Sequence, residues 1–211
     1  MTVDTAAIAA TVVRRLGRVA FEPTWQTMRF FNKARGPDTP DEIWLLEHEP
    51  VFTLGLAGRE VHVLDAGDIP VVHCDRGGQV TYHGPGQAVA YVLFDLRRMH
   101  MGVKDLVRRL EQSAIEVLEG YRIRGERRDG MPGVYVEGAK IAAVGLRIAN
   151  GCSYHGLSLN VDLDLTPYRR IDPCGYPGLA STRLADHGVR DSIDAVQQRL
   201  LDALRKCLKS T

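Results

Sequence analysis

A single cysteine stands between a proline and a glycine in the stretch RRIDPCGYPG, from Arg169 to Gly178. A structural cysteine usually sits inside a periodic apolar run, where it packs as a small hydrophobe, and Cys174 has no such run around it. The flanking proline and glycine predict an irregular turn that can present a side chain to a cleft. A thiol becomes a nucleophile when a nearby cation or base lowers its pKa or takes its proton. Cys174 is therefore the candidate nucleophile.

Lys140 is a candidate partner for that thiol, as are the histidines. It precedes the apolar run Ile141 to Val144 in EGAKIAAVG. Partial desolvation would favour the neutral amine, which can act as a base, and an ionised Lys140 would supply a fixed positive charge. A lysine at a strand edge with its head group in solvent is the common case, and the stretch by itself favours that alternative. A Cys-Lys pair suits acyl transfer, because a thiolate accepts an acyl group from another thioester at little free-energy cost.

The stretch RGGQVTYHGPGQ, from Arg76 to Gln87, holds four glycines and a proline within twelve positions. Glycines are useful where the backbone must approach a ligand closely or adopt a positive φ. Arg76, Tyr82 and His83 would supply charge and hydrogen bonds there. The structural alternative is a glycine-rich hairpin with a packed tyrosine and a satisfied histidine. The stretch matches neither GxGxxG nor GxxxxGK[ST], which disfavours a dinucleotide or P-loop phosphate site.

The remaining cysteines and one histidine complete the set of candidates. His155 stands beside Gly156 at the expected start of a strand in SYHGLSLNVD, and a lone histidine there is more often structural than catalytic. Cys152, expected in a loop, competes with Cys174 as the reactive thiol, whereas Cys207 is expected to pack in the last turn of a helix. No CxxC pair is present, which disfavours a zinc knuckle or a disulfide framework.

Hydrophobic periodicity predicts the elements that must position these groups. Helices are expected from near Pro23 to Arg35, with Trp25, Met28 and Phe31 on one face, from Val103 to about Glu119, and over the C-terminal SIDAVQQRLLDALRKCLK. Strands are expected at EIWLLEH, PVFTLG, IPVVHC, AVAYVLFDL, the two halves of GVYVEGAKIAAVGLRI, and YHGLSLNVDLDL. Strands outnumber helices and most are joined by short turns, so we expect an α+β fold, a mixed sheet flanked by helices. No repeat or linker divides the chain, and residues 1–211 are expected to form one domain.

Bulk composition excludes several classes of function. The chain has 211 residues, 45% of them hydrophobic and 25% charged, with a formal net charge of +1. No apolar run is long enough to span a bilayer, and the charge gives no general attraction to nucleic acid. The basic stretch RIRGERR, Arg122 to Arg128, is read as a solvated loop, with a docking site for an acidic protein as the alternative. The N-terminus has its charges in the reverse of the order of a secretory signal, so a cytoplasmic location is expected.

Taken together, these segments resemble the octanoyltransferase family, the lipoyl(octanoyl) transferases of lipoate biosynthesis. RGGQVTYHGPGQ, GAKIAAVG, HGLSLNVD and IDPCG match the motifs of that family in identity, order and approximate spacing, over about Phe21 to Leu184. The resemblance implies a fold similar to the catalytic domain of biotin and lipoate protein ligases.

The resemblance also implies roles for individual residues. Cys174 matches the nucleophile that takes the octanoyl group as a thioester, and Lys140 matches the lysine that lowers the pKa of that thiol and helps to move protons. Together with His155, the positions expected to bind substrate are Arg76, Gly77, Gly78, Gln79, Val80, Thr81, Tyr82, His83, Ala143, Val144, Gly145, Gly156, Leu157 and Ser158.

The reaction implied by the resemblance is a ping-pong acyl transfer that needs no ATP, metal or other cofactor. The donor would be octanoyl-acyl carrier protein. The acceptors would be lysines of lipoyl domains, in the E2 subunits of 2-oxoacid dehydrogenases and in the glycine cleavage H protein. No nucleic acid or membrane partner is expected.

Three rival functions remain open at this point. An ATP-dependent lipoate or biotin ligase of the same fold would make an acyl-adenylate and need no nucleophilic cysteine. A non-catalytic acyl-binding module would leave Cys174 without a role. An amidotransferase that moves the acyl group between two lipoyl domains would share the fold and the Cys-Lys pair.

Overall fold

The computed structural model describes residues 11–172 and 178–209. Its longer helices are α2 (Phe21–Ala34), α3 (Val103–Gly120) and α4 (Ile193–Lys209), and its short 3₁₀ turns are η1 (Glu60–His62), η2 (Thr166–Arg170) and η4 (Leu184–His187). The strands are β1 (Val12–Val19), β2 (Glu42–His48), β3 (Val51–Leu54), β4 (Val71–His73), β5 (Val80–His83), β6 (Gln87–Leu93), β7 (Val134–Val136), β8 (Ala139–Ala149) and β9 (Cys152–Asn160).

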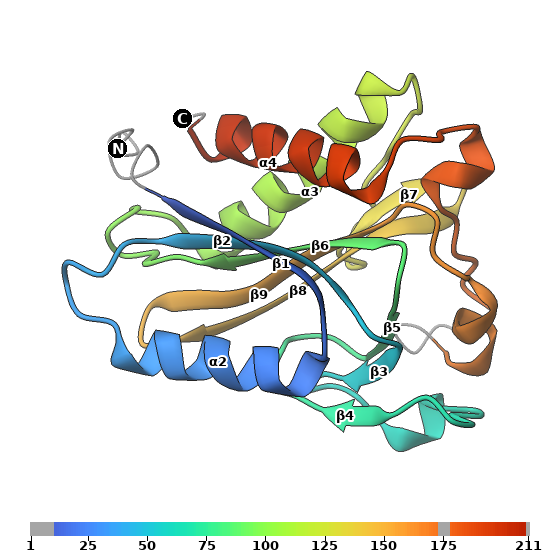
Figure 1. Cartoon of the computed structure of the whole chain (residues 1–211), viewed down its shortest axis with the longest axis horizontal. Coiled ribbons are helices and arrows are strands. Elements are labelled where there is room, and N and C mark those ends of the chain that lie inside the picture. Colours follow the sequence, from blue (N-terminus) through green and yellow to red (C-terminus); the bar gives the residue numbers. More distant parts are fainter. Residues whose placement is uncertain (1–10, 173–177, 210–211) are drawn as a thin grey trace.

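Two mixed sheets organise these elements. The larger has the order β1-β2-β6-β9-β8-β7, in which only β1 and β2 pair in parallel. The smaller has the order β4-β3-β5, with β3 parallel to β4 and antiparallel to β5. Helices α3 and α4 cover one face of the larger sheet and α2 covers the other (Figure 1). The predicted α+β class, a mixed sheet flanked by helices, is confirmed, and the expectation of one domain stays a prediction.

The two faces of the larger sheet carry separate cores. Aliphatic side chains such as Leu106, Leu110, Leu200 and Leu204 fill the space between the sheet and the α3/α4 pair. On the other face, Met28 of α2 packs in a smaller aromatic cluster with Trp25 and Phe31 beside it, which is the helix face that the sequence predicts. Apolar residues at helical spacing bury one stripe of each helix, and this burial stabilises the layers.

Three features of the strands differ from the predictions. Strand β1 was not predicted, because it is a largely exposed edge strand whose arginines interrupt any alternation of apolar and polar residues. It pairs with β2, which lies more than twenty residues away in the sequence. Strand β5 lies inside the glycine-rich stretch. Strand β9 begins at Cys152, which is therefore buried in a strand and not in a loop. It ends at Asn160, so Leu163 packs under the smaller sheet instead of continuing the strand.

Candidate active site

A cavity of about 290 Å³ opens among β5, β6, β8 and β9. This size is close to the lower limit of roughly 300 Å³ that is typical of small-molecule sites. Its wall is mainly apolar, with contributions from α3 and from the turn before β5. The apolar lining residues are Phe21, Val80, Val89, Val103, Val107, Ile141, Ala142, Ala143, Val144, Leu146 and Leu157.

Lys140 lies at one end of this cavity, which we call the lysine end. The side chain is buried, with 8% of its surface exposed, so the solvent-exposed alternative is wrong. Its Nζ donates a hydrogen bond to the carbonyl oxygen of Pro132 at 3.2 Å and lies 5.2 Å from the ring centroid of Tyr135. These contacts hold Lys140 Nζ at the cavity wall.

Cys174, the predicted nucleophile, falls in residues 173–177, outside the part of the chain that the structure describes. The described backbone on both sides of this gap is held by bridges to other segments. Before it, Ile171 forms a bridge with Val63. After it, Ser181 forms a parallel bridge with Lys140, whose backbone N–H donates to Ala180 O at 2.8 Å. The chain therefore passes beside Lys140 seven positions after Cys174, and the role of Cys174 stays a prediction.

The glycine-rich stretch forms one wall of the cavity, and Arg76 holds it in place. The Arg76 guanidinium is buried and donates to Thr53 Oγ1, Thr53 O, Gly77 O and Gln79 O at 2.6–3.1 Å. Its charge therefore organises the loop backbone. Gly78 has a φ of +86°, a conformation that favours glycine over residues with a Cβ, and Gly77 N donates to Leu146 O of β8 at 2.8 Å.

Strands β8 and β9 supply the facing wall. Ala143 pairs with Ser158 and Gly145 pairs with Gly156. A Cβ on Gly156 would lie 2.1 Å from the carbonyl oxygen of Ala90, so only glycine fits between β9 and β6 there. All the predicted substrate-binding positions except Tyr82 line the cavity. The ring of Tyr82 packs instead with Phe52 and Leu163 under the smaller sheet. Substrate binding at these positions stays a prediction.

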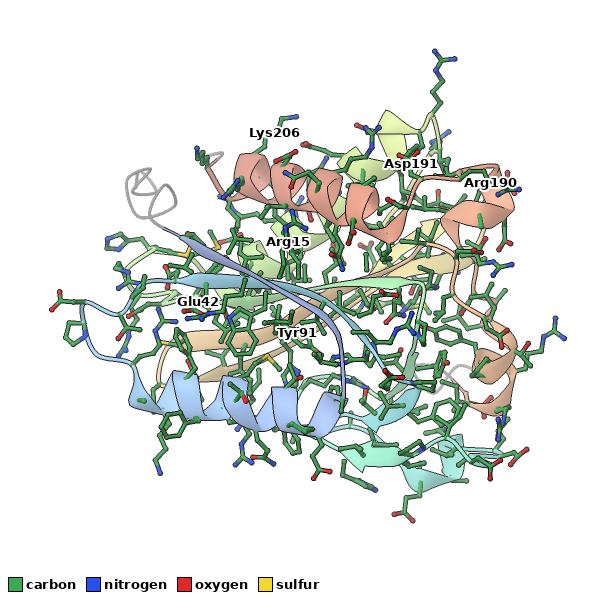
Figure 2. The ribbon with its side chains drawn as sticks, viewed as in Figure 1. Arg15, Glu42, Tyr91, Arg190, Asp191 and Lys206 are labelled. Atoms are coloured by element: carbon green, nitrogen blue, oxygen red, sulfur yellow. The ribbon has the colours of Figure 1, made fainter. Side chains whose placement is uncertain are left out.

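A cluster of rings, which the sequence did not reveal, lies on the α2 side of the sheet. We define the ring cluster as Phe21, His48, His83, Tyr91 and His155. Phe21, the first residue of α2, stacks on His83 and on His155 at centroid distances of 6.1 and 6.3 Å, and His48 lies 5.7 Å from both His83 and Tyr91. Figure 2 shows Tyr91 between the sheet and α2. Four of the five rings line the cavity, and His48 lies behind them.

Burial keeps the histidines of this cluster neutral. Desolvation lowers the pKa of His48 to about 4, against a hydrogen bond to Val19 O, and lowers the pKa of His83 to about 3. Burial also lowers the pKa of His155, although its hydrogen bond to Asp75 opposes this shift. Burial would raise the pKa of Asp75, but hydrogen bonds from His155, Tyr154 and Trp25 hold it far below its usual range. Asp75 is therefore ionised.

The backbone of His155 is unusual for a strand residue. Its φ is +62°, in the left-handed region that non-glycine residues rarely adopt. This conformation accompanies the stacking of its ring on Tyr154, the residue before it, at 5.2 Å, and the contact of Nε2 with Asp75 Oδ1 at 3.2 Å. Strained backbone of this kind clusters at functional sites. No periodicity signal could have revealed it, because the neighbours come from β6, α2 and the turn after β4.

The cysteines that the structure describes are poor nucleophiles. Cys74, Cys152 and Cys207 are all buried and free. Burial, together with Asp95, raises the pKa of the Cys152 thiol, and burial with Glu116 raises the pKa of Cys207 to about 12. Cys152 does not line the cavity. These observations disfavour Cys152, which the sequence left as the competitor of Cys174.

The described residues contain neither a metal site nor a membrane-spanning helix. Within 11–172 and 178–209, no group of three or more His, Cys, Asp or Glu side chains is arranged to hold a metal ion. In the same ranges, no helix is both long and apolar enough to cross a membrane.

The fold resembles solved structures of ligases at low sequence identity. A lipoate-protein ligase A bound with ATP aligns with a TM-score of 0.75 at 15% identity, covering 94% of this chain and 85% of that one. A biotin protein ligase from Aquifex aeolicus aligns with a TM-score of 0.57 at 14% identity, covering 94% of this chain and 68% of that one. These likenesses establish the fold alone, and they confirm the ligase-type catalytic fold that the motifs imply.

Sequence relatives establish the family. The family model "Lipoyl protein ligase A/B catalytic domain" matches residues 22–205. The octanoyltransferase of Azoarcus sp. (strain BH72) is 60% identical over 199 residues, 93% of this chain and 87% of that protein. The octanoyltransferase of Alkalilimnicola ehrlichii is 62% identical over 177 residues, 84% of this chain and 82% of that protein. The chain therefore belongs to the octanoyltransferases, acyltransferases built on the lipoyl protein ligase A/B catalytic domain.

Proposed function

We propose that this enzyme moves an octanoyl group from octanoyl-acyl carrier protein to the ε-amine of a lysine on lipoyl domains, through a thioester on Cys174. The acceptors would be lipoyl domains of 2-oxoacid dehydrogenase E2 subunits and the glycine cleavage H protein. The observation that carries the proposal is the mainly apolar cavity that runs away from a buried lysine. Such a cavity suits a medium-length acyl chain with its carbonyl group at the lysine end.

Two transfers would follow in sequence. The Cys174 thiolate attacks the carbonyl carbon of the carrier thioester, and the bond to the phosphopantetheine sulfur breaks. This sulfur leaves and takes a proton from Lys140, whose amine is then neutral. The neutral amine of the incoming lysine then attacks the acyl-enzyme carbonyl. The amide bond forms, Cys174 leaves as a thiolate, and the amine gives up one proton to Lys140, directly or through water. The second step is downhill because a thioester becomes an amide, so the transfer needs no ATP.

Mass spectrometry of the intact protein tests the proposed acyl-enzyme. We expect an octanoyl adduct, sensitive to hydroxylamine, after mixing with octanoyl-acyl carrier protein without ATP, and we expect a lipoyl domain to discharge it. Cys174→Ala should give no adduct, whereas the matched control Cys152→Ala should be labelled like the wild type. Labelling of Cys174→Ala, or a requirement for ATP, would rule out the cysteine route.

A second variant separates two roles of Lys140. Lys140→Arg keeps the positive charge but cannot readily accept a proton. We expect the adduct to form while discharge to the lipoyl domain slows by about a hundredfold, within the range for general acid-base catalysis. Near-normal discharge would leave Lys140 only an electrostatic role.

The ligase alternative is not favoured. The octanoyltransferase relatives share 56–62% identity with this chain, whereas the lipoate ligase structure shares 15%.

A further inference from the structure

The cavity has a second end, remote from Lys140. Along β8, Gly145 lies five residues beyond Lys140, and it pairs with Gly156, which in turn pairs with Tyr91 of β6. At about 3.3 Å per residue this separation is roughly 16 Å, and the side chains of Lys140 and of the ring cluster both reach into it. An acyl chain held by its carbonyl group at the lysine end therefore points its tail at the rings. We call this second end the ring end.

The hydrogen bonds behind the rings set which nitrogen of each histidine carries the proton. His155 Nε2 faces the ionised Asp75, which can only accept, so Nε2 carries the hydrogen and Nδ1 has a bare lone pair. His83 Nδ1 lies 2.7 Å from Gln87 Oε1, and the Gln87 amide nitrogen donates to Asn160 Oδ1. His83 Nδ1 is therefore the donor, and Nε2 has the bare lone pair.

Tyr91 is oriented in the same way. His48 Nδ1 lies 3.0 Å from the carbonyl oxygen of Val19, so it donates, and Nε2 must accept. The Tyr91 hydroxyl, 2.6 Å from that Nε2, consequently donates its only proton away from the cavity. Its oxygen can then only accept a further hydrogen bond.

The ring end thus presents hydrogen-bond acceptors that no described side chain satisfies. Within the described part of the chain, neither His83 Nε2 nor His155 Nδ1 has a hydrogen-bond partner. In the same part, Gln79 Oε1, from another residue of the cavity wall, is a buried oxygen without a partner. The Arg76 guanidinium, a nearby set of donors, is engaged by loop oxygens and Thr53. A purely apolar tail would leave these acceptors buried and unsatisfied, which is unfavourable.

We propose that the ring end is a hydrogen-bond-acceptor subsite that takes acyl chains carrying a donor, such as a hydroxyl group, on the distal carbon. The inference rests on the proposed function, because it assumes that the acyl carbonyl lies at the lysine end. In an ordinary apolar pocket, an added hydroxyl group loses its hydration and finds no partner, which weakens binding by roughly 10- to 100-fold. Here the bare nitrogens and the Tyr91 oxygen replace the lost water.

Matched acyl donors test the subsite on the wild-type enzyme. The ω-hydroxyoctanoyl chain has the shape of nonanoyl, and the ω-methoxyoctanoyl chain, which cannot donate, has the shape of decanoyl. We expect kcat/KM for the hydroxyl chain to be within about threefold of that for nonanoyl, and kcat/KM for the methoxy chain to be at least about tenfold below that for decanoyl. The proposal would be overturned if the hydroxyl and methoxy chains lowered kcat/KM by the same factor relative to their hydrocarbon counterparts. It would also be overturned if the hydroxyl chain lowered kcat/KM tenfold.

A variant pair locates the effect. Tyr91→Phe removes one acceptor with little change of shape, and we expect the ratio of ω-hydroxyoctanoyl to nonanoyl transfer to fall about tenfold. The control Tyr121→Phe removes a hydroxyl group that donates to Asp191, outside the cavity, and should leave the ratio unchanged. An unchanged ratio in Tyr91→Phe would contradict the assignment of this oxygen.

A binding measurement separates this inference from the proposed function. Calorimetry with the neutral amides ω-hydroxyoctanamide and nonanamide needs no catalysis, and we expect comparable affinities for the two. If the enzyme transfers no octanoyl group but binds the two amides with comparable affinity, the proposed function is wrong and the subsite is supported. If octanoyl transfer is normal but ω-hydroxyoctanamide binds tenfold more weakly than nonanamide, the proposed function is supported and the subsite is wrong.

Discussion

The two faces of the larger sheet are packed in different ways. On the α3/α4 face, aliphatic side chains fill the interface and few polar groups are buried. On the α2 face, His48, His83 and His155 are buried next to a cavity, and Asp75 contacts His155. Dense aliphatic packing stabilises a fold without specifying chemistry, whereas buried polar groups reduce stability unless they are satisfied. The difference indicates that the α3/α4 face contributes mainly apolar packing, including part of the cavity wall, whereas the α2 face contributes the polar rings of the cavity.

The largest expected effect separates activity from stability. Lys140→Met should lower the rate of octanoyl transfer on the order of 1,000-fold, because it removes both the charge and the proton acceptor at the lysine end. The free energy of unfolding should change little, since the new side chain fills a similar volume. Transfer assays and urea unfolding of the same sample measure both quantities. Lys33→Met, at an exposed position of α2, is the control. A fully active Lys140→Met variant would show that the active site does not lie at the lysine end.

The next effect concerns acid. The folded-state pKa values of His48 and His83, about 4 and 3, lie below the ordinary value of 6.5. The unfolded chain therefore binds more protons, and stability present above pH 6.5 is lost as the pH falls toward those values. Between pH 7 and pH 5 each histidine should cost about 2 kcal/mol, together about 4 kcal/mol, with His155 acting in the same direction.

Urea unfolding at pH 7, 6 and 5 measures this loss. His48→Gln should lose about 2 kcal/mol less than the wild type over that interval, whatever its stability at pH 7. His73→Gln, which alters an exposed histidine, should show the wild-type slope. A wild-type stability that is flat from pH 7 to pH 5 would mean that the ring cluster is not buried in its neutral form.

A void created by mutation in the α3/α4 core should lower stability and leave activity nearly unchanged. Leu204 of α4 is fully buried in the aliphatic core. Leu204→Ala should lower the free energy of unfolding by about 3 kcal/mol, from lost burial and the void left behind. Octanoyl transfer per folded molecule should stay within about twofold of the wild type, as assays well below the unfolding temperature can determine. A tenfold loss of transfer would show that the two faces are coupled.

The smallest effect lies in the loop between α3 and β7. Of the arginines in RIRGERR, Arg127 pairs with Glu111 and Arg128 stacks on Tyr135. Arg122 and Arg124 are exposed and have no side-chain partner in the described part of the chain. Replacing these two with glutamate should slow encounter with an acidic carrier about threefold at low salt, an effect that vanishes at high salt. The control Lys33→Glu reverses a charge at an exposed position outside this loop. Unchanged stopped-flow kinetics would exclude docking at this loop.

Local pattern was sufficient for most of the architecture, and the resemblance to the family motifs pointed to the residues of the cavity wall. Apolar spacing predicts α2, α3 and α4 and most strands, because each of these buries one stripe or one face. The motifs likewise point to Lys140 and to the lining residues of β8 and β9. Pattern failed for β1, whose exposed edge has no apolar periodicity, and for Tyr82, whose ring turns to the smaller sheet.

The sequence by itself determined the kind of chemistry and the family, since both depend on residue types in short stretches. Only the tertiary structure decided which side chains share the ring end. Phe21, His48 and His155 come from three distant segments. The pairing of β6 with β2 and with β9, and the packing of α2 on the sheet, bring them together. The tautomer of each histidine depends in turn on an acceptor from another element, such as Asp75 for His155. A hydrogen-bond partner set by long-range packing leaves no periodic signal along the chain, so this part of the site could be found only in the folded molecule.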